Sequence, residues 1–133
     1  MTRRWLAALA VVAVSVVAAG CTASAATQRV EIGIHYSAFQ PTEVTVPRGV
    51  PVTFVLTNDD PIDHEWLIGD AAFHERHRTG TEPAHGARPD EVSLPALGSA
   101  QTTLTFDQAG DIQFICHFPG HEAYGMVGVV HVE

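Results

Sequence analysis

Short stretches of alternating hydrophobic and polar residues recur along most of the chain after residue 28. In the first of them, Val30, Ile32, Ile34 and Tyr36 alternate with polar or small residues, the period-two pattern of a half-buried strand. Comparable segments lie at residues 44–46, 50–57, 64–68, 92–94, 102–106, 112–116 and 126–132. About eight short strands separated by turns, with no long helix, predict an all-β fold: a Greek-key antiparallel β-sandwich.

The alternation stops between residues 70 and 90. Asp70 is suited to cap a short helix over residues 71–77, because its carboxylate can accept a hydrogen bond from the first helical turn. Residues 79–83 then read Thr-Gly-Thr-Glu-Pro, which is typical of a loop. We therefore expect a short helix-containing insert at about 70–90 in the sandwich.

The N-terminal segment has the composition of an export signal. Arg3 and Arg4 precede an apolar run over residues 5–19, which is shorter than the roughly 20 residues that a membrane-spanning helix needs. The run ends in Val-Ala-Ala-Gly-Cys at residues 17–21, which resembles the bacterial lipobox, although Ala18 stands where Leu is usual. We expect a signal peptide at 1–20 and lipidation of Cys21. Cleavage near Ala-Ser-Ala at residues 23–25, as in ordinary secretion, is the alternative.

The charge of the exported part limits the partners that it can bind. The whole chain has a formal net charge of −8; without Arg3 and Arg4 it retains five Arg against fifteen acidic residues, or −10. Nucleic acids and anionic lipids attract basic surfaces, so neither is expected to bind. We expect a tether at 21–28 and one monomeric domain at 29–133. We expect this domain to bind an electropositive protein partner. It would be located at the outer face of the cell membrane or in the periplasm, and a lipid on Cys21 would be its only contact with the membrane.

The chemistry of the chain concentrates in residues 116–126, directly after a predicted strand. Cys116, His121 and Met126 stand there at the spacing C-x4-H-x4-M. His64, upstream, shares the face of its predicted strand with Trp66, so it points inward if Trp66 is in the core. Two imidazoles, one thiolate and a weak axial thioether suit copper that cycles between Cu(I) and Cu(II). We therefore predict one type 1 copper ion per chain.

Each of these residues also has an ordinary role when it is considered alone. A single Cys is often a buried apolar side chain, and Cys116 could instead form a disulfide with Cys21, the other cysteine of the chain. Met126 could fill the core, and a histidine in a loop is usually solvated. A lipid on Cys21 would leave Cys116 alone in an oxidising compartment, where metal binding protects a thiol. The combination of the four residues favours the metal site.

The residues from Cys116 to His121, Cys-His-Phe-Pro-Gly-His, resemble the copper loop of the azurins. The spacing C-x4-H-x4-M resembles that of the rusticyanins and auracyanins, and all three groups are cupredoxins. The likeness covers about residues 29–133, including Pro-Arg-Gly at 47–49 and Asn58 before the first histidine. It implies a cupredoxin-like sandwich and one-electron transfer. It also implies that His121 lies near the surface, where a cytochrome or oxidase could dock on Phe118, Pro119, Ala123 and Tyr124.

Glu65 departs from the family pattern, in which Asn or Ser often follows the first histidine and steadies the cysteine loop. An ionised carboxylate cannot donate a hydrogen bond, and its negative charge would favour Cu(II) and lower the reduction potential. The alternative is that Glu65 points to water, as its position on the outward face of the strand suggests. The nearby Asp59, Asp60 and Asp63 indicate either a solvated turn or, together with Glu65, a site for a hard cation.

The insert at 70–90 contains three histidines. His74 and His77 are three residues apart, so a helix would place them on one face, and His85 follows in the loop. Together they could hold a second, looser metal ion, for example during copper loading. The alternative is a solvated surface helix whose histidines bind nothing.

His117 directly follows Cys116, as in the type 1 loop of multicopper oxidases. Those enzymes also need His-x-His pairs and several domains, whereas this chain has no such pair and has Ile115 before the cysteine. We expect His117 to face outward opposite Cys116, either free or hydrogen-bonded, and we expect the protein not to be an enzyme. The three functions considered are a one-electron carrier, an envelope copper-binding or trafficking protein, and a relative of the oxidases or nitrite reductases.

Overall fold

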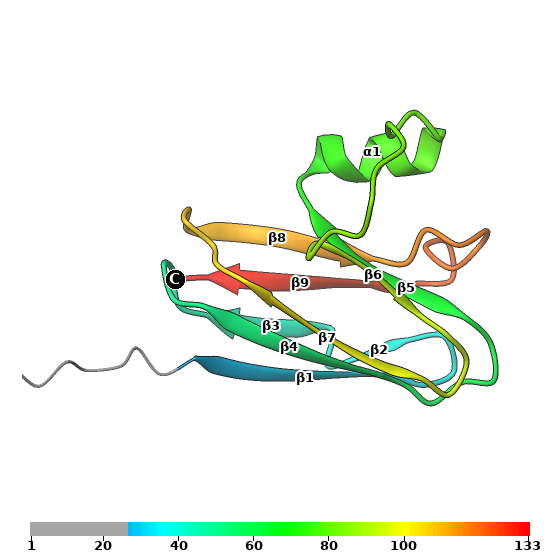
Figure 1. The fold of residues 1–133 in the computed structure, drawn as a ribbon, viewed down its shortest axis with the longest axis horizontal. Helices are drawn as coiled ribbons and strands as arrows, with labels where there is room; N and C mark the ends of the chain where they lie inside the picture. The colour runs from blue at the N-terminus through cyan, green and yellow to red at the C-terminus, as the bar shows by residue number, and fades with distance from the viewer. Residues whose placement is uncertain (1–26) are drawn as a thin grey trace, which may run out of the picture.

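Two β-sheets face each other in residues 27–133, the part of the chain that the structure, a computed structural model, describes (Figure 1). Their strands are β1 (Gln28–Ile34), β2 (Phe39–Gln40), β3 (Glu43–Val46), β4 (Val52–Asn58), β5 (His64–Gly69), β6 (Glu91–Leu94), β7 (Ser99–Leu104), β8 (Gly110–Ile115) and β9 (Val127–Val132). One helix, α1 (Ala71–Thr79), lies between β5 and β6 in the chain. The predicted signal peptide, Cys21, the alternative cleavage site and most of the tether fall outside the described residues.

The strands follow the order β2-β1-β4-β7 in one sheet and β3-β9-β8-β5-β6 in the other. The sandwich predicted from the sequence is confirmed, with one difference in pairing: β1 lies parallel to β4, and β3 lies parallel to β9. The other strand pairs are antiparallel. Parallel neighbours cannot be joined by a tight hairpin, and in both cases the chain visits the other sheet before it returns.

Aromatic side chains fill the space between the sheets. Phe54 of β4, Trp66 of β5 and Phe114 of β8 are each fully buried, and the Trp66 ring centroid lies 5.0 Å from that of Phe54 and 5.9 Å from that of Phe114. Ile32 and Ile34 are also buried, as the alternation predicted. Tyr36 is not, because the chain leaves β1 after Ile34 and turns with φ of 52° at this residue, which is 84% exposed.

The insert contains the helix that the sequence predicts, and it extends two residues further. Asp70 caps its start, with the side-chain Oδ1 accepting a 2.7 Å hydrogen bond from the Phe73 amide, and Gly80 ends it in the left-handed conformation. Phe73 and His74 are its buried residues, and α1 covers the outer face of the second sheet beside β5 (Figure 1). No helix within residues 27–133 combines the length and apolarity needed to cross a membrane.

The connection that leads to His64 and the connection that carries the other predicted metal ligands lie together at one end of the sandwich. Residues 59–63 lead into β5 and residues 116–126 join β8 to β9, both at the end opposite to the C-terminus (Figure 1). The topology explains the meeting, because β5 and β8 are antiparallel neighbours. The start of β5 therefore lies beside the end of β8.

Replacing Gly128 with Ala should destabilise the sandwich. A Cβ atom there would lie 2.1 Å from Phe114 Cζ and 2.7 Å from the Thr42 carbonyl oxygen, so the core would have to shift. We expect a loss of about 1–3 kcal/mol in the free energy of unfolding, measured by urea denaturation. Gly86→Ala is the matched control, since a Cβ there meets nothing within 4 Å. Equal unfolding midpoints for the two variants would show that the core around Phe114 has room for the added methyl group.

Candidate metal centre

Three of the four residues predicted to bind metal converge on one point. His64 begins β5, Cys116 directly follows β8, and His121 lies in the loop before β9. Nδ1 of His121 lies 3.1 Å from Nδ1 of His64 and 3.2 Å from Sγ of Cys116. The ligand atoms of the three residues all lie within 4.8 Å of one another, and His64 and Cys116 are fully buried. Two imidazole nitrogens and a sulfur therefore face one another in a confined space.

Met126 is placed beside this group by the backbone of the loop. Its amide donates to the carbonyl oxygen of His121 at 3.0 Å, and its own carbonyl accepts from the Cys116 amide at 3.2 Å. The side chain is fully buried and belongs to the hydrophobic core. Gly120 and Gly125 have positive φ values of 85° and 97°, which allow the tight turns between the three loop residues.

Asp60 determines which nitrogen of His64 faces the site. Its Oδ2 lies 3.0 Å from His64 Nε2, which leaves Nδ1 directed toward Cys116 and His121. The same buried carboxylate accepts 2.7 Å hydrogen bonds from the amides of Tyr36 and Ser37. Burial raises the pKa of Asp60, but these hydrogen bonds outweigh it and the pKa lies below its usual value. A carboxylate that fixes the outer nitrogen of a histidine is common around protein-bound metals.

Burial shifts the pKa values of Cys116 and His121 in the directions that favour their neutral forms. Burial raises the pKa of the Cys116 thiol, and the nearby charge of Glu65 raises it further. Burial also lowers the pKa of His121, as does the neighbouring His64, so its imidazole keeps a lone pair. A metal ion would displace the thiol proton and bind these lone pairs, so the donor set fits a soft or borderline metal.

Glu65 does not point to water, although its outward position on the strand suggested that it would. Its Oε1 accepts a 2.8 Å hydrogen bond from the amide of His117, the residue after Cys116. By accepting this hydrogen bond, the Glu65 carboxylate connects β5 to the start of the loop at residues 116–126. Burial raises its pKa, while the bond from the His117 amide acts in the opposite direction. The parity of a strand determines the face on which a side chain lies, but not what covers that face.

The four acidic residues near His64 do not act as one group. Asp60 and Glu65 make the contacts described above, and Asp63 Oδ1 accepts a hydrogen bond from the Ala96 amide at 2.9 Å. Asp59 is exposed. Among residues 27–133, these carboxylates form no cluster of three potential metal ligands. The structure therefore gives no support for a hard-cation site there.

His117 is covered by α1 and does not face solvent freely. Its Nε2 lies 2.9 Å from Nδ1 of His74, whose Nε2 lies 3.1 Å from the Gln113 carbonyl oxygen. The ring of His77 stacks on it with a centroid distance of 5.7 Å. Only 6% of the His117 side chain is exposed, and burial lowers the pKa of both His117 and His74. The contact between His117 and His74 therefore connects the insert to the loop that carries Cys116.

The three histidines of the insert do not meet at one place. His74 pairs with His117, whereas His77 and His85 both approach Glu91 at the start of β6. Sequence reasoning missed Glu82 and Glu91, because a carboxylate in a loop or at a strand end has no distinctive spacing. The alternation of the predicted strand at residues 92–94 was the only indication of where Glu91 would lie.

The residues predicted to dock a partner surround His121 at the surface. The Phe118 ring lies 5.9 Å from that of His121 and is partly buried against the core. Pro119 and Ala123 are exposed, and Tyr124 is 82% exposed. The arrangement offers apolar area next to the imidazole of the centre.

Comparison with known proteins also indicates copper binding, as the donor set of the site does. Residues 26–133 match the family described as copper binding proteins, plastocyanin/azurin family. The chain is 38% identical over 98 residues to the copper-resistant cuproprotein CopI of Rubrivivax gelatinosus, covering 71% of this chain and only 59% of that protein. It is 29% identical over 143 residues to CopI of Pseudomonas aeruginosa, covering 84% of this chain and 79% of that protein.

Solved structures of auracyanins have the same fold. Auracyanin B superposes with a TM-score of 0.66 at 24% identity, covering 80% of this chain and 88% of the other. Auracyanin A of Chloroflexus aurantiacus, a blue copper protein, gives a TM-score of 0.60 at 27% identity, with 79% and 98% covered.

Replacing Asp60 with Asn should destabilise the metal-free protein. One of the two carboxylate oxygens becomes an NH2 group, which would face an N–H donor in a buried site. We expect a loss of about 1–3 kcal/mol in the free energy of unfolding, measured by urea denaturation in the presence of a chelator. The exposed neighbour gives the control, Asp59→Asn, which should unfold like the wild type. If both variants unfold alike, Asp60 does not organise this end of the sandwich.

Proposed function

The chain belongs to the plastocyanin/azurin family of copper-binding proteins, and we propose that it is an exported one-electron carrier with a single type 1 copper site. His64, Cys116 and His121 would form the plane of the site, and Met126 would be a weak axial ligand. The observation that carries this proposal is the convergence of two imidazole Nδ1 atoms and one thiol sulfur within 4.8 Å. This donor set is the one that suits copper in electron transfer.

Copper supplies a one-electron couple between Cu(I) and Cu(II), and the protein limits how far the ligands rearrange. His64 is fixed at the start of a strand by Asp60, and the loop is held by hydrogen bonds from Cys116 to Met126 and from Met126 to His121. Cu(I) and Cu(II) prefer different geometries, so ligands that are free to move would reorganise with each electron. Ligands held by a rigid fold reorganise little, which favours fast transfer.

The partner would dock where His121 is closest to the surface. Phe118, Pro119, Ala123 and Tyr124 provide apolar area around it, which suits the weak and short-lived contact of redox partners. The net charge of the exported part would attract an electropositive cytochrome or oxidase and make the association rate fall with salt. A lipid on Cys21 would keep the monomer at the outer face of the cell membrane or in the periplasm.

Copper binding for tolerance or trafficking is the second candidate function. The relatives that match this chain are named copper-resistant cuproproteins. A carrier function requires a reversible one-electron wave in voltammetry, whereas a trafficking function requires copper that is transferred to an acceptor. An oxidase or nitrite reductase would need catalytic copper beyond one type 1 ion, and the chain has no His-x-His pair. We therefore propose that it is not an enzyme.

Replacing Cys116 with Ser should abolish the intense visible absorption of the Cu(II)-loaded protein. That absorption arises from charge transfer between a thiolate and Cu(II), and Ser has no sulfur. The measurement is a visible spectrum of the loaded, exported protein. Cys21→Ser is the matched control and should keep the band. A band that survives in Cys116→Ser, or that is absent from the wild type, would disprove the type 1 site.

Replacing Glu65 with Gln should raise the reduction potential of the copper site. Gln keeps an oxygen that can accept the hydrogen bond from the His117 amide, but it removes a carboxylate that favours Cu(II). We expect a rise of tens of millivolts, since a tenfold change in a one-electron equilibrium corresponds to about 59 mV. Protein-film voltammetry measures it. Glu31→Gln, on the exposed face of β1, is the control. An unchanged or lower potential in Glu65→Gln would contradict the electrostatic role.

A further inference from the structure

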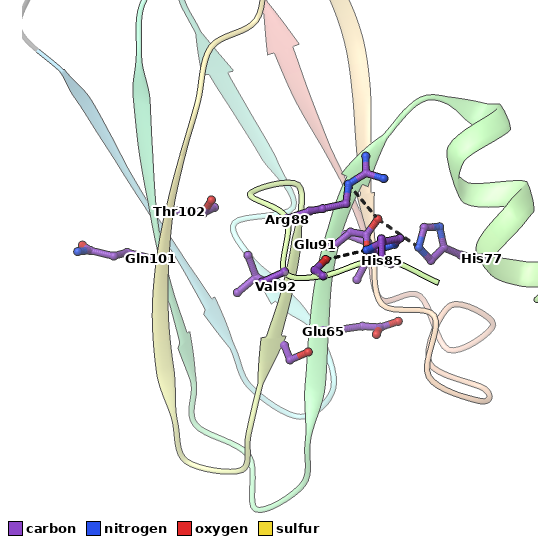
Figure 2. A pocket seen from close by; sticks show the side chains of 12 residues that line it. Glu65, His77, His85, Arg88, Glu91, Val92, Gln101 and Thr102 are labelled. Atoms are coloured by element: carbon purple, nitrogen blue, oxygen red, sulfur yellow. Dashed lines mark hydrogen bonds and ion pairs between the residues drawn. The ribbon is translucent and has the colours of Figure 1, made fainter. Parts of the chain in front are cut away.

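A cavity of about 550 Å³ lies outside the sandwich, between the insert and the outer face of β5 and β6. Among its lining residues are two histidines and two carboxylates: His77, His85, Glu65 and Glu91. Figure 2 shows His77 and His85 pointing toward Glu91 from two separate segments of the insert. None of these residues is a ligand of the proposed copper centre, so the copper centre does not account for their convergence.

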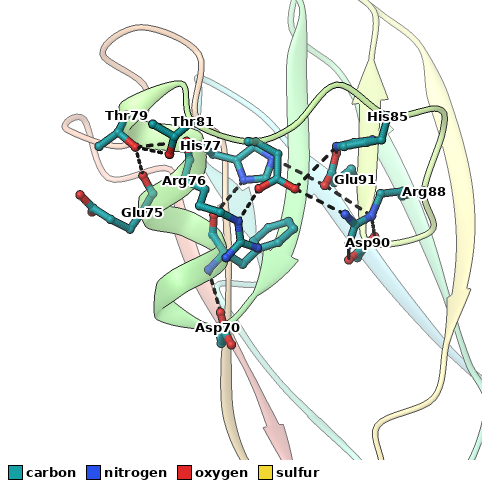
Figure 3. A network of polar contacts seen from close by, with 12 residues as sticks. Asp70, Glu75, Arg76, His77, Thr79, Thr81, His85, Arg88, Asp90 and Glu91 are labelled. Atoms are coloured by element: carbon teal, nitrogen blue, oxygen red, sulfur yellow. Dashed lines mark hydrogen bonds and ion pairs between the residues drawn. The ribbon is translucent and has the colours of Figure 1, made fainter.

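The distances within this group are those of a potential metal site. Nε2 of His85 lies 3.1 Å from Oε2 of Glu91 and 3.9 Å from Oε1 of Glu82. Nε2 of His77 lies 3.6 Å from Oε1 of Glu91 (Figure 3). Ligand atoms of Glu82, His85 and Glu91 all lie within 4.8 Å of one another. Glu91 is thus approached by an imidazole on each of its two oxygens.

Hydrogen bonds to the backbone show which ring nitrogen of each histidine carries the proton. Nδ1 of His77 lies 2.9 Å from the Phe73 carbonyl oxygen, and Nδ1 of His85 lies 2.8 Å from the Gly86 carbonyl oxygen. A carbonyl oxygen only accepts, so Nδ1 is the protonated nitrogen in both rings. In the neutral imidazoles, both Nε2 lone pairs then face carboxylate oxygens. Two lone pairs repel each other unless a proton or a metal cation lies between them.

The arginines nearby make their hydrogen bonds to other carboxylates than Glu91. Arg88 makes two hydrogen bonds to Asp90, at 3.1 Å and 2.8 Å, and Arg76 donates to Glu82. Oε1 of Glu91 is buried and accepts no hydrogen bond: Arg88 Nε lies 3.6 Å away, close enough for an ion pair but too far for a hydrogen bond, and Arg88 Nη1 lies 3.5 Å from Oε1 of Glu82. A buried carboxylate oxygen without a donor is costly and rare.

The charges around the cavity also favour a divalent cation. Four carboxylates lie in or beside it, and two guanidinium groups pair with them: Glu65, Glu82, Asp90 and Glu91 against Arg76 and Arg88. The histidines add no charge in their neutral forms. The local excess is therefore two negative charges, which one divalent ion would balance.

We propose that His77, His85 and Glu91, assisted by Glu82, bind a second divalent metal ion of the borderline class, Cu(II) or Zn(II). Imidazole nitrogen together with carboxylate oxygen suits these ions, and histidines fixed through Nδ1 by backbone carbonyls are typical of metal ligands. The site contains no sulfur, so it favours Cu(II) over Cu(I). It does not depend on the proposed copper centre, because the two sites share no ligand.

Counting Cu(II) in the exported protein tests the site, because Cu(II) binds such ligands more tightly than Zn(II) does. We expect two Cu(II) per chain in the wild type after equilibrium dialysis. The second ion should give a paramagnetic resonance spectrum with imidazole nitrogen couplings and no thiolate absorption. We expect the affinity for the second ion to fall at least about tenfold in each of three variants: His85→Ala, His77→Ala and Glu91→Gln. The thiolate band should be unchanged in all three.

Two further variants separate this site from the copper centre and from histidines elsewhere on the surface. His131→Ala is the matched control, since its imidazole lies on β9 and contacts Asp111 and Glu43 instead; it should retain both ions. Cys116→Ser should lose the thiolate band and keep the sulfur-free Cu(II) signal, so failure of the copper centre would leave this site detectable. A wild type that binds only the Cu(II) of the thiolate band, with no sulfur-free Cu(II) signal, would overturn the proposal and leave the cluster as ion pairs of protonated histidines. Retention of the second ion in the His77→Ala, His85→Ala double variant would overturn it as well.

Discussion

A single buried carboxylate links three segments at the end of the sandwich where the candidate ligands meet. Asp60 accepts hydrogen bonds from the amides of Tyr36 and Ser37, and it contacts the outer nitrogen of His64. Asn58 supports it by accepting from the Asp60 amide and donating to the carbonyl oxygens of Ile62, Leu94 and Pro95. The geometry of the centre depends on this arrangement, because His64 is the one candidate ligand among residues 27–133 that lies outside the loop at 116–126.

The two faces of β5 carry two different polar environments. His64 points inward to the thiol and imidazole of the loop, whereas Glu65 lies on the opposite face, lines the cavity with His77, His85 and Glu91, and accepts from the His117 amide. One half-buried carboxylate thus contacts the backbone beside Cys116 and the space where a second cation is proposed. The charge of Glu65 already raises the pKa of Cys116, so a cation in that space would act on the proposed copper centre through the same carboxylate.

The insert contacts the loop that carries two of the candidate ligands. His74 joins the side chain of His117, and Arg78 makes hydrogen bonds to Glu122 in the same loop. Both contacts hold the loop through residues that Asp60 does not touch. A short helix capped by Asp70 and Gly80 therefore restrains the segment that carries Cys116 and His121, which keeps ligand rearrangement small in the proposed electron transfer.

The sequence by itself determined the strands other than β2, the helix start at Asp70 and the inward direction of His64, because alternation and capping are local properties of the chain. The loop spacing also sufficed to predict Cys116, His121 and Met126 as one group. Only the tertiary structure decided what covers each outward face. Glu65 bonds the His117 amide, His117 pairs with His74 under α1, and His85 meets Glu91 beside β6. These contacts join residues that are 6 to 52 positions apart in the chain. They form because the insert packs against the sheet and the loop, and the alternation of hydrophobic and polar residues does not predict that packing.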